Sequence, residues 1–241
     1  MITYFFQKST LNILAIKSIF TSLKNAGFTA FLVGGAVRRP FINLPILDID
    51  ITTDATPDQI GHLFHISNNT GQAFGSVTIQ HNGITADITT FRTESQYKNS
   101  RHPSKVVFAN TIEVDLLRRD FTINAIAFNP ITQQLIDTTG GIADIKAKQL
   151  TCIGDPTKRF KEDTLRLIRL ARFAAETNFD IHPNTLAAFM TLGPTCKLPS
   201  KKRIGKEMIT LLKYPHASKG INLLLENGLL LRLFDSLNKG V

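Results

Sequence analysis

Two aspartates separated by one residue, Asp48 and Asp50, are the residues best suited to catalysis by type and spacing. Apolar residues alternate with them, which predicts a β-strand over Leu47 to Thr52 with both carboxylates on one face, about 6.6 Å apart. Carboxylates so placed can bind one or two divalent cations, and paired cations stabilise the attacking and leaving oxygens of an in-line phosphoryl displacement. A solvated strand face or a turn carries the same pattern, so the pair alone leaves both interpretations open.

A glycine pair, Gly34-Gly35, lies upstream of the aspartates, between a strand predicted over Thr29 to Val33 and a predicted helix. Glycines at such a junction let backbone N–H groups approach a triphosphate, and the start of the following helix adds positive partial charge. An ordinary tight turn is the alternative. The order of strand, glycines and acidic pair favours a nucleotide site.

Further polar residues extend this candidate site. Asp87 falls in a strand predicted over Ile84 to Phe91, which pairs with Gly75 to Gln80 through an Asn82-Gly83 turn. The Asp87 carboxylate is a candidate third metal ligand, or a base that takes the proton of an attacking hydroxyl. The alternative interpretation is that Asp87 is a surface residue that supports the strand.

On a helix predicted over Lys161 to Thr177, Asp163, Arg166 and Arg169 recur every three residues and therefore project from one face. A carboxylate accepts from the exocyclic amine of cytosine or adenine, while a guanidinium donates to the adjacent ring nitrogen. Uracil and guanine lack this pattern. A surface ion pair worth only a few tenths of a kcal/mol is the other interpretation.

Composition favours a globular protein with a polyanionic partner. The chain has 241 residues, 43% of them hydrophobic, and a formal net charge of +9. No run of about 18 apolar residues occurs, so we expect no membrane association. The two cysteines, Cys152 and Cys196, have no metal-ligand spacing, which favours a reducing, cytoplasmic location.

Short strand patterns mix with helices in the first half of the chain, and longer helical patterns fill the second half. We expect an α/β or α+β domain with a small antiparallel or mixed sheet, followed by an all-α segment. Helices are predicted over Leu11 to Asn25, Asn184 to Thr191, Ser200 to Leu212 and Ala217 to Asn227.

Several segments, in order, resemble the class II tRNA nucleotidyltransferase and bacterial poly(A) polymerase family, which belongs to the polymerase-β-like superfamily. They are FLVGGAVRRPFINLPILDIDITT, DITTFR, DLLRRDFTINAIAF, LIDTTGGIADI, EDTLRLIRLARFAA and SKKRIGKEM. The resemblance implies an α+β head domain over residues 1–138, a helical neck over 139–195 that recognises the base, and the start of a helical body over 196–241.

The resemblance also implies template-independent addition of C and A from CTP and ATP to the 3′ end of tRNA or another RNA, with Mg²⁺ as cofactor. The implied catalytic residues are Asp48, Asp50 and Asp87, of which Asp48 and Asp50 bind the metal. The implied nucleotide-binding residues are Gly34, Gly35, Arg38, Arg118, Arg119, Asp120, Asn124, Asp163, Arg166 and Arg169. The helix from Ser200, with Arg203 and Glu207, is implied to support the base-reading helix.

Two departures from the family pattern leave alternatives open. Arg39 and Pro40 stand where the family has other residues, and a proline there can kink or delay the helix after the glycines. The chain also stops short of the family's usual length, so a second chain supplying the missing helices is one expectation. Poly(A) addition and a catalytically impaired RNA-binding remnant are the alternative functions.

Overall fold

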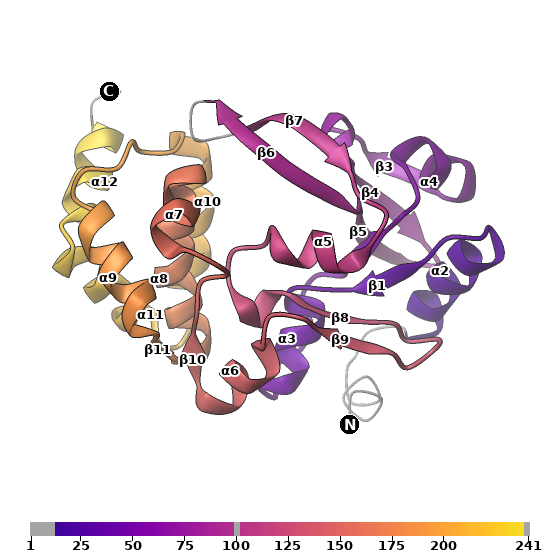
Figure 1. The fold of residues 1–241 in the computed structure, drawn as a ribbon, viewed down its shortest axis with the longest axis horizontal. Helices are drawn as coiled ribbons and strands as arrows, with labels where there is room; N and C mark the ends of the chain where they lie inside the picture. The colour runs from indigo at the N-terminus through magenta and orange to yellow at the C-terminus, as the bar shows by residue number, and fades with distance from the viewer. Residues whose placement is uncertain (1–12, 99–101, 239–241) are drawn as a thin grey trace. The chain divides into compact units, whose positions relative to one another are not determined.

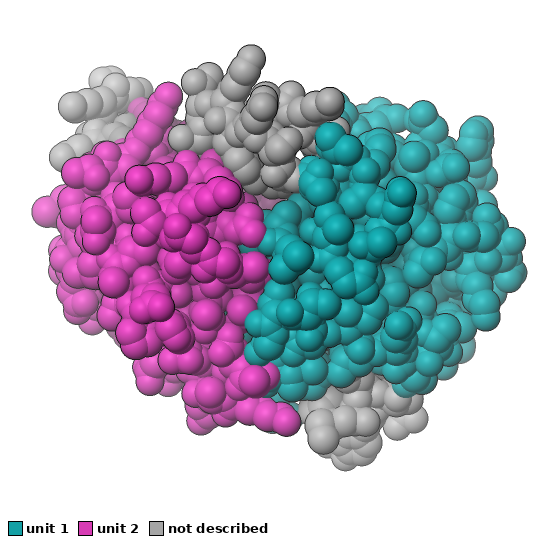
Figure 2. Space-filling view, viewed as in Figure 1, with its two compact units in different colours: residues 1–95, 105–119, 123–142 teal, residues 96–104, 120–122, 143–241 magenta. Residues whose placement is uncertain are grey.

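A computed structural model describes residues 13–98 and 102–238, which divide into two compact units (Figure 2). Unit 1 comprises residues 1–95, 105–119 and 123–142, and unit 2 comprises residues 96–104, 120–122 and 143–241. The predicted division into head, neck and body stays a prediction. No helix in the described ranges is long and apolar enough to cross a membrane.

A seven-stranded mixed sheet forms the centre of unit 1, in the order β3-β4-β5-β2-β1-β8-β9 (Figure 1). Strands β2 and β5 run parallel, and the other neighbouring pairs run antiparallel. The strands are β1 (Ala30–Leu32), β2 (Asp50–Thr53), β3 (His65–Asn68), β4 (Ser76–His81), β5 (Ile84–Thr90), β8 (Ile126–Phe128) and β9 (Leu135–Asp137). A separate two-stranded sheet pairs β6 (Arg92–Lys98) with β7 (His102–Phe108).

Local sequence explains much of this unit. Residues Ile16, Ile19 and Leu23 are buried at helical spacing on α2 (Ile13–Asn25), which confirms the predicted helix over its described part. Asn82 and Gly83 have φ angles of 47° and 77° in the turn between β4 and β5, which confirms the predicted hairpin. The other helices here are α3 (Gly35–Phe41), α4 (Pro57–Leu63), α5 (Ile112–Leu117) and the 3₁₀ turns η1 (Gln72–Phe74) and η2 (Thr122–Asn124).

The strand predicted over residues 47–52 begins later than expected, at Asp50. Strand β1 pairs Leu32 with Ile51, and the chain then turns at Gly34 into α3, so residues 47 and 48 lie beyond the end of β1. A strand from Leu47 would point this side chain to the core, on the face opposite the carboxylates, but the Leu47 side chain is 59% exposed.

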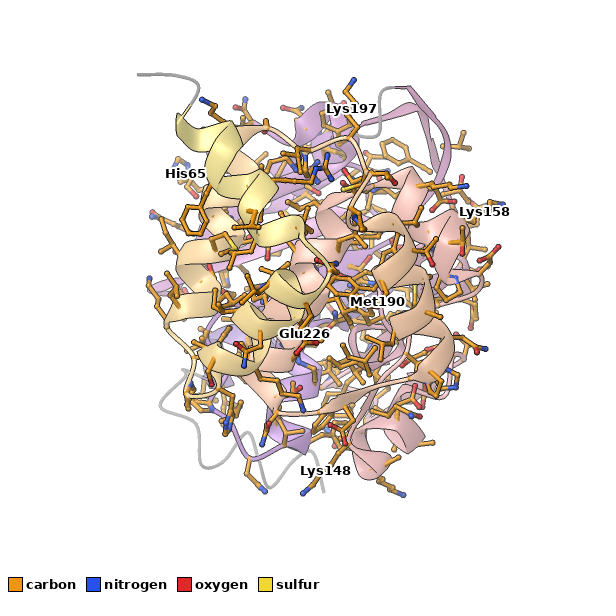
Figure 3. The ribbon with its side chains drawn as sticks, turned by 90° about the vertical axis from the view of Figure 1, so that its left-hand side faces the viewer. His65, Lys148, Lys158, Met190, Lys197 and Glu226 are labelled. Carbon is orange, nitrogen blue, oxygen red and sulfur yellow. The ribbon has the colours of Figure 1, made fainter. Side chains whose placement is uncertain are left out.

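Unit 2 is mainly helical and contains α7 (Pro156–Glu162), α8 (Leu165–Thr177), α9 (Pro183–Leu192), α10 (Lys201–Leu212), α11 (Ala217–Glu226) and α12 (Leu229–Asn238). Helix α6 (Gly141–Ala147) leads into it, and β10 (Gln149–Leu150) pairs in parallel with β11 (Asp180–Ile181). Lys148, Lys158 and Lys197 project from the surface of this unit (Figure 3). The helices predicted in the C-terminal segment are confirmed to within one or two residues.

One helix prediction in unit 2 is wrong. The helix predicted over Lys161 to Thr177 is broken at Asp163, which has extended backbone angles (φ −143°, ψ 104°). The Asp163 carboxylate accepts from the backbone N–H of Leu165 at 3.1 Å, and so satisfies one of the donors that the start of α8 leaves free. Asp163 therefore precedes the helix that carries Arg166 and Arg169.

Candidate functional site

Two of the predicted catalytic carboxylates face each other across neighbouring strands. Asp50 on β2 is the register partner of Asp87 on β5, which places both side chains on one face of the sheet. Asp87 is exposed, and its carboxylate accepts a hydrogen bond of 2.5 Å from the Thr78 hydroxyl on β4. Asp48, just before β2, is exposed as well.

Charges of both signs surround Asp50. Burial raises the pKa of its carboxyl group, and Arg119 opposes that rise. Asp87 and Asp48 raise the same pKa further, whereas Arg38 lowers it. The other two predicted catalytic carboxylates and two predicted phosphate-binding arginines thus all act on Asp50.

Gly34 brings the backbone close to Asp50. Its φ angle is 60°, and a β-carbon placed there would lie 3.4 Å from the Asp50 Oδ2 atom. No side chain caps the start of α3, which begins at Gly35. Pro40 lies one residue before the end of this helix, and the first turn still forms, because the backbone N–H of Arg38 donates to the Gly34 carbonyl at 2.9 Å. Helix α3 begins directly after Gly34, so the expected delay of the helix is not found.

Arg38 and Asn124 form a second pair in unit 1. Both side chains are buried, and the Arg38 guanidinium donates a hydrogen bond to the Asn124 carbonyl oxygen. Arg38 comes from α3 and Asn124 from η2, so two segments far apart in the sequence meet here. The structure therefore brings together two residues that sequence reasoning assigned to the same substrate.

Asp115, on α5, anchors the predicted arginine pair. Its fully buried carboxylate accepts from Arg118 at 2.7 and 2.9 Å, from Arg119 at 2.9 Å and from the Thr52 hydroxyl at 3.3 Å. Burial alone would raise the pKa of Asp115, but Arg119 and Arg118 hold it below its ordinary value. The buried Nε of Arg119 has no hydrogen-bond partner among the described residues. Sequence reasoning missed Asp115, although its spacing from the arginines, three and four residues along a helix, signals such a contact.

The predicted base-reading residues lie in unit 2 and have separate partners. Asp163 pairs with Arg203 on α10, whose two terminal nitrogens lie 3.2 and 2.7 Å from the two carboxylate oxygens. Arg166 is buried and donates to Glu162 at 2.9 Å and to the Arg159 carbonyl at 2.7 Å. The expectation that Asp163 shares one helix face with the two arginines is wrong, because the helix break comes between them.

Arg169 makes the third set of contacts in this unit. It donates to Asp120 at 2.7 Å and to Glu207 at 3.3 Å, and Glu207 also accepts from Arg172 at 2.6 Å. Glu207 on α10 thus holds two arginines of α8. Together with the Arg203 pair, these contacts confirm that the helix from residue 201 supports the predicted base-reading segment. Sequence reasoning did not single out Arg172, or Glu162, which accepts from Arg166.

The acidic residues of unit 1 suit Mg²⁺ by ligand type, because this ion prefers oxygen ligands and uses one or two carboxylates together with substrate phosphates. A half-buried carboxylate whose pKa is raised by burial and by two neighbouring carboxylates fits a cation. Within the described ranges, no group of three or more His, Cys, Asp or Glu residues is arranged to hold a metal by itself.

Comparison with known proteins gives consistent matches. Residues 30–151 match the family described as "Poly A polymerase head domain", and residues 178–240 match "Probable RNA and SrmB- binding site of polymerase A". The chain is 42% identical over 212 residues to the CCA-adding enzyme of Leuconostoc citreum, covering 88% of this chain and 52% of that protein. It is 41% identical over 215 residues to the CCA-adding enzyme of a Geobacillus species, covering 89% and 53%.

Among solved structures, the crystal structure of the Bacillus stearothermophilus CCA-adding enzyme in complex with CTP is similar, with a TM-score of 0.81 and 36% identity. The match covers 90% of this chain and 52% of that one. The chain thus spans about half the length of these relatives. The predicted fold class, an α+β head of the polymerase-β-like type followed by helices, is confirmed.

Proposed function

The chain belongs to the family of the poly(A) polymerase head domain, and we propose that it is a template-independent RNA nucleotidyltransferase that adds C and A to the 3′ end of tRNA. The observation that carries this proposal is the pairing of Asp50 with Asp87 beside Gly34 and Arg119. Phosphoryl transfer requires carboxylates that bind a metal. It also requires accessible backbone N–H groups and cationic side chains that bind phosphates.

In this proposal, Asp48 and Asp50 hold Mg²⁺. When bound, this ion neutralises the negative charge of the triphosphate and stabilises the negative charge that develops during transfer. Asp87 accepts the proton of the attacking 3′-hydroxyl. Its exposure and its hydrogen bond from Thr78 support this role, because the carboxylate is both accessible and held in place.

The triphosphate lies near Gly34 and Gly35, and a β-carbon at Gly34 would contact the Asp50 carboxylate at 3.4 Å. Arg118 and Arg119 bind its phosphate oxygens through the partly exposed guanidinium groups that Asp115 holds in place. Arg38 and Asn124 complete the set by binding the sugar and phosphates.

Base selection belongs to unit 2 in this proposal. Asp163 and Arg166 read the amine and ring nitrogen of cytosine or adenine, and Arg169 and Asp120 stabilise the segment from which they project. Because Arg203 occupies both oxygens of Asp163, base binding requires the carboxylate to share or exchange those hydrogen bonds. A cytoplasmic location is part of the same proposal, and both cysteines are free thiols.

The test uses purified protein, Mg²⁺ and a tRNA that lacks its terminal CCA, with labelled CTP and ATP given separately and together. We expect C addition from CTP alone and completion of CCA with both triphosphates. Long tails from ATP alone would indicate poly(A) addition instead. Retained RNA binding without incorporation under every condition would indicate a catalytically impaired protein and contradict the proposal.

A further inference from the structure

A cavity of about 580 Å³ lies in unit 2 between α11, α9 and β11, within the size range of small-molecule sites. Aliphatic and polar side chains share its wall. The lining residues are Asp180, Ile181, Leu186, Ser218, Lys219, Asn222, Leu223 and Glu226. None of them has a role in the function proposed above, so the cavity needs a separate explanation.

Helix α11 forms the long wall of this cavity. Four of its residues are spaced so that they lie on one side of the helix, namely Lys219, Asn222, Leu223 and Glu226. The buried residues Gly220 and Leu224 lie on a different side. A β-carbon at Gly220 would lie 2.5 Å from the carbonyl oxygen of Ala171, so that side of α11 packs directly on α8. Packing against α8 therefore holds the cavity wall in place.

The two ends of the cavity differ in how their charges are balanced. At one end, the Lys219 ammonium donates to the Asp180 carboxylate at 2.9 Å and to the Asn178 carbonyl oxygen at 3.2 Å. The cavity thus already holds one alkylammonium group of the chain itself. At the other end, about 10 Å along α11, Glu226 is exposed and has no hydrogen bond or ion pair with the residues that the structure describes.

The position of Glu226 in its helix strengthens the attraction for a cation at this end (Figure 3). Glu226 is the last residue of α11, where the final carbonyl groups carry a partial negative charge. The last turn contains no basic residue that would balance this charge. A bound cation would therefore interact favourably with both the carboxylate and the helix end, whereas a phosphate group would be repelled.

Aliphatic side chains fill the wall between the two ends. Ile181, Leu186 and Leu223 line the cavity, and each of them is half-buried. A hydrocarbon chain that covers them removes apolar surface from water on both partners. We propose that this cavity binds a primary aliphatic amine, with its ammonium group at Glu226 and its hydrocarbon chain against these three residues. This site does not depend on the nucleotide transfer proposed above.

The binding test uses hexylamine as the probe and the isoleucine methyl resonances of the full chain in NMR spectra. Hexylamine should shift the Ile181 resonance, identified with Ile181→Val, with a millimolar Kd. The resonance of Ile209, which is exposed on α10, should not move. Hexanoate has the opposite charge and should bind at least about fivefold more weakly. Equal binding of hexanoate and hexylamine would overturn the inference, because apolar contact alone would then explain it.

Two pairs of variants test where each part of the amine binds. Glu226→Gln should weaken hexylamine binding about fivefold, whereas Glu113→Gln, at an exposed glutamate of α5, should leave it unchanged. Leu223→Ala should weaken binding about three- to fivefold, whereas Leu225→Ala, at an exposed leucine of the same helix, should not. Circular dichroism checks that all four variants are folded. Unchanged affinity in either Glu226→Gln or Leu223→Ala would contradict the site.

Two further measurements test other ligands for the same cavity. Glu226→Gln should leave the Kd for tRNA lacking CCA within about twofold, because RNA does not occupy this cavity in our proposal. Nα-acetyl-lysinamide should bind more weakly than hexylamine, because its polar amide groups would lie against aliphatic side chains. Clearly tighter tRNA binding by Glu226→Gln would assign the cavity to RNA, and tighter binding of the lysine derivative would assign it to a protein partner. Either result would overturn the assignment to a free amine.

Discussion

Replacing Asp115 tests whether one buried carboxylate holds the arginine pair in place. Asp115→Ala removes an acceptor of four hydrogen bonds, three of them from Arg118 and Arg119 and one from Thr52. Removing one partner of a buried ion pair costs about 3–5 kcal/mol. The arginine side chains are 15% and 17% exposed, so water compensates them in part. We therefore expect a loss of about 3 kcal/mol in the free energy of unfolding.

Urea denaturation followed by circular dichroism measures this loss. Asp180→Ala is the matched control, because its 92% exposed carboxylate pairs with Lys219 at the surface and should contribute less than about 0.5 kcal/mol. Asp115→Asn keeps an acceptor oxygen and should cost about 2 kcal/mol. Equal, small losses for Asp115→Ala and Asp180→Ala would refute the assignment of Asp115 as a buried anchor.

The stabilisation that Asp115 provides should depend on pH. The pKa of Asp115 in the folded chain lies below its ordinary value of 3.8, so its ionised form stabilises the fold fully at pH values above 3.8. This stabilisation is lost as the pH falls from 3.8 through the pKa of the folded state. The difference in unfolding free energy between the wild type and Asp115→Asn should therefore be constant near neutral pH and shrink under acidic conditions. A difference that grows on acidification would contradict the ion-pair account.

Three further predictions concern other parts of the chain. Gly34→Ala should raise the KM for CTP and cost about 1–2 kcal/mol of stability, whereas Gly27→Ala, also at positive φ but with open space around it, should affect stability alone. Steady-state kinetics and urea denaturation separate these effects. Arg203→Ala should cost about 1 kcal/mol through its pair with Asp163, as measured by urea denaturation, and no loss would contradict that contact. Burial raises the pKa of the Cys152 thiol to about 12, so iodoacetamide at pH 8 should label Cys152 only after unfolding, as mass spectrometry can show.

Local patterns in the sequence predicted the parts of the fold that depend on local interactions. The Asn82-Gly83 turn identified the β4–β5 hairpin, because positive φ angles are required there. The alternation around Asp50 identified a strand but not its first residue. The start of β2 depends on where β1 ends, which is a long-range property that alternation does not contain.

The sequence predicted which residue types form the candidate site, but not which of these residues contact one another. The pairing of Asp50 with Asp87 is set by the register of two strands that are far apart in sequence. Asp115 was missed because a charged run usually lies on the surface, and its burial depends on packing against β2. The break at Asp163 was missed because residues 161–164 contain neither glycine nor proline to mark a helix end, and the ion pair with Arg203 is a tertiary contact.

Nucleotide transfer through Asp50 is the central claim, and a single-turnover assay tests it most directly. Wild-type protein and Asp50→Asn are mixed with labelled CTP, Mg²⁺ and tRNA lacking CCA, and the rate of C addition is measured. Loss of a metal-binding carboxylate should remove several kcal/mol of transition-state stabilisation, so we expect the Asn variant to react at least about 100-fold more slowly. Circular dichroism should show that the variant remains folded. An equal rate in the two proteins would contradict the account.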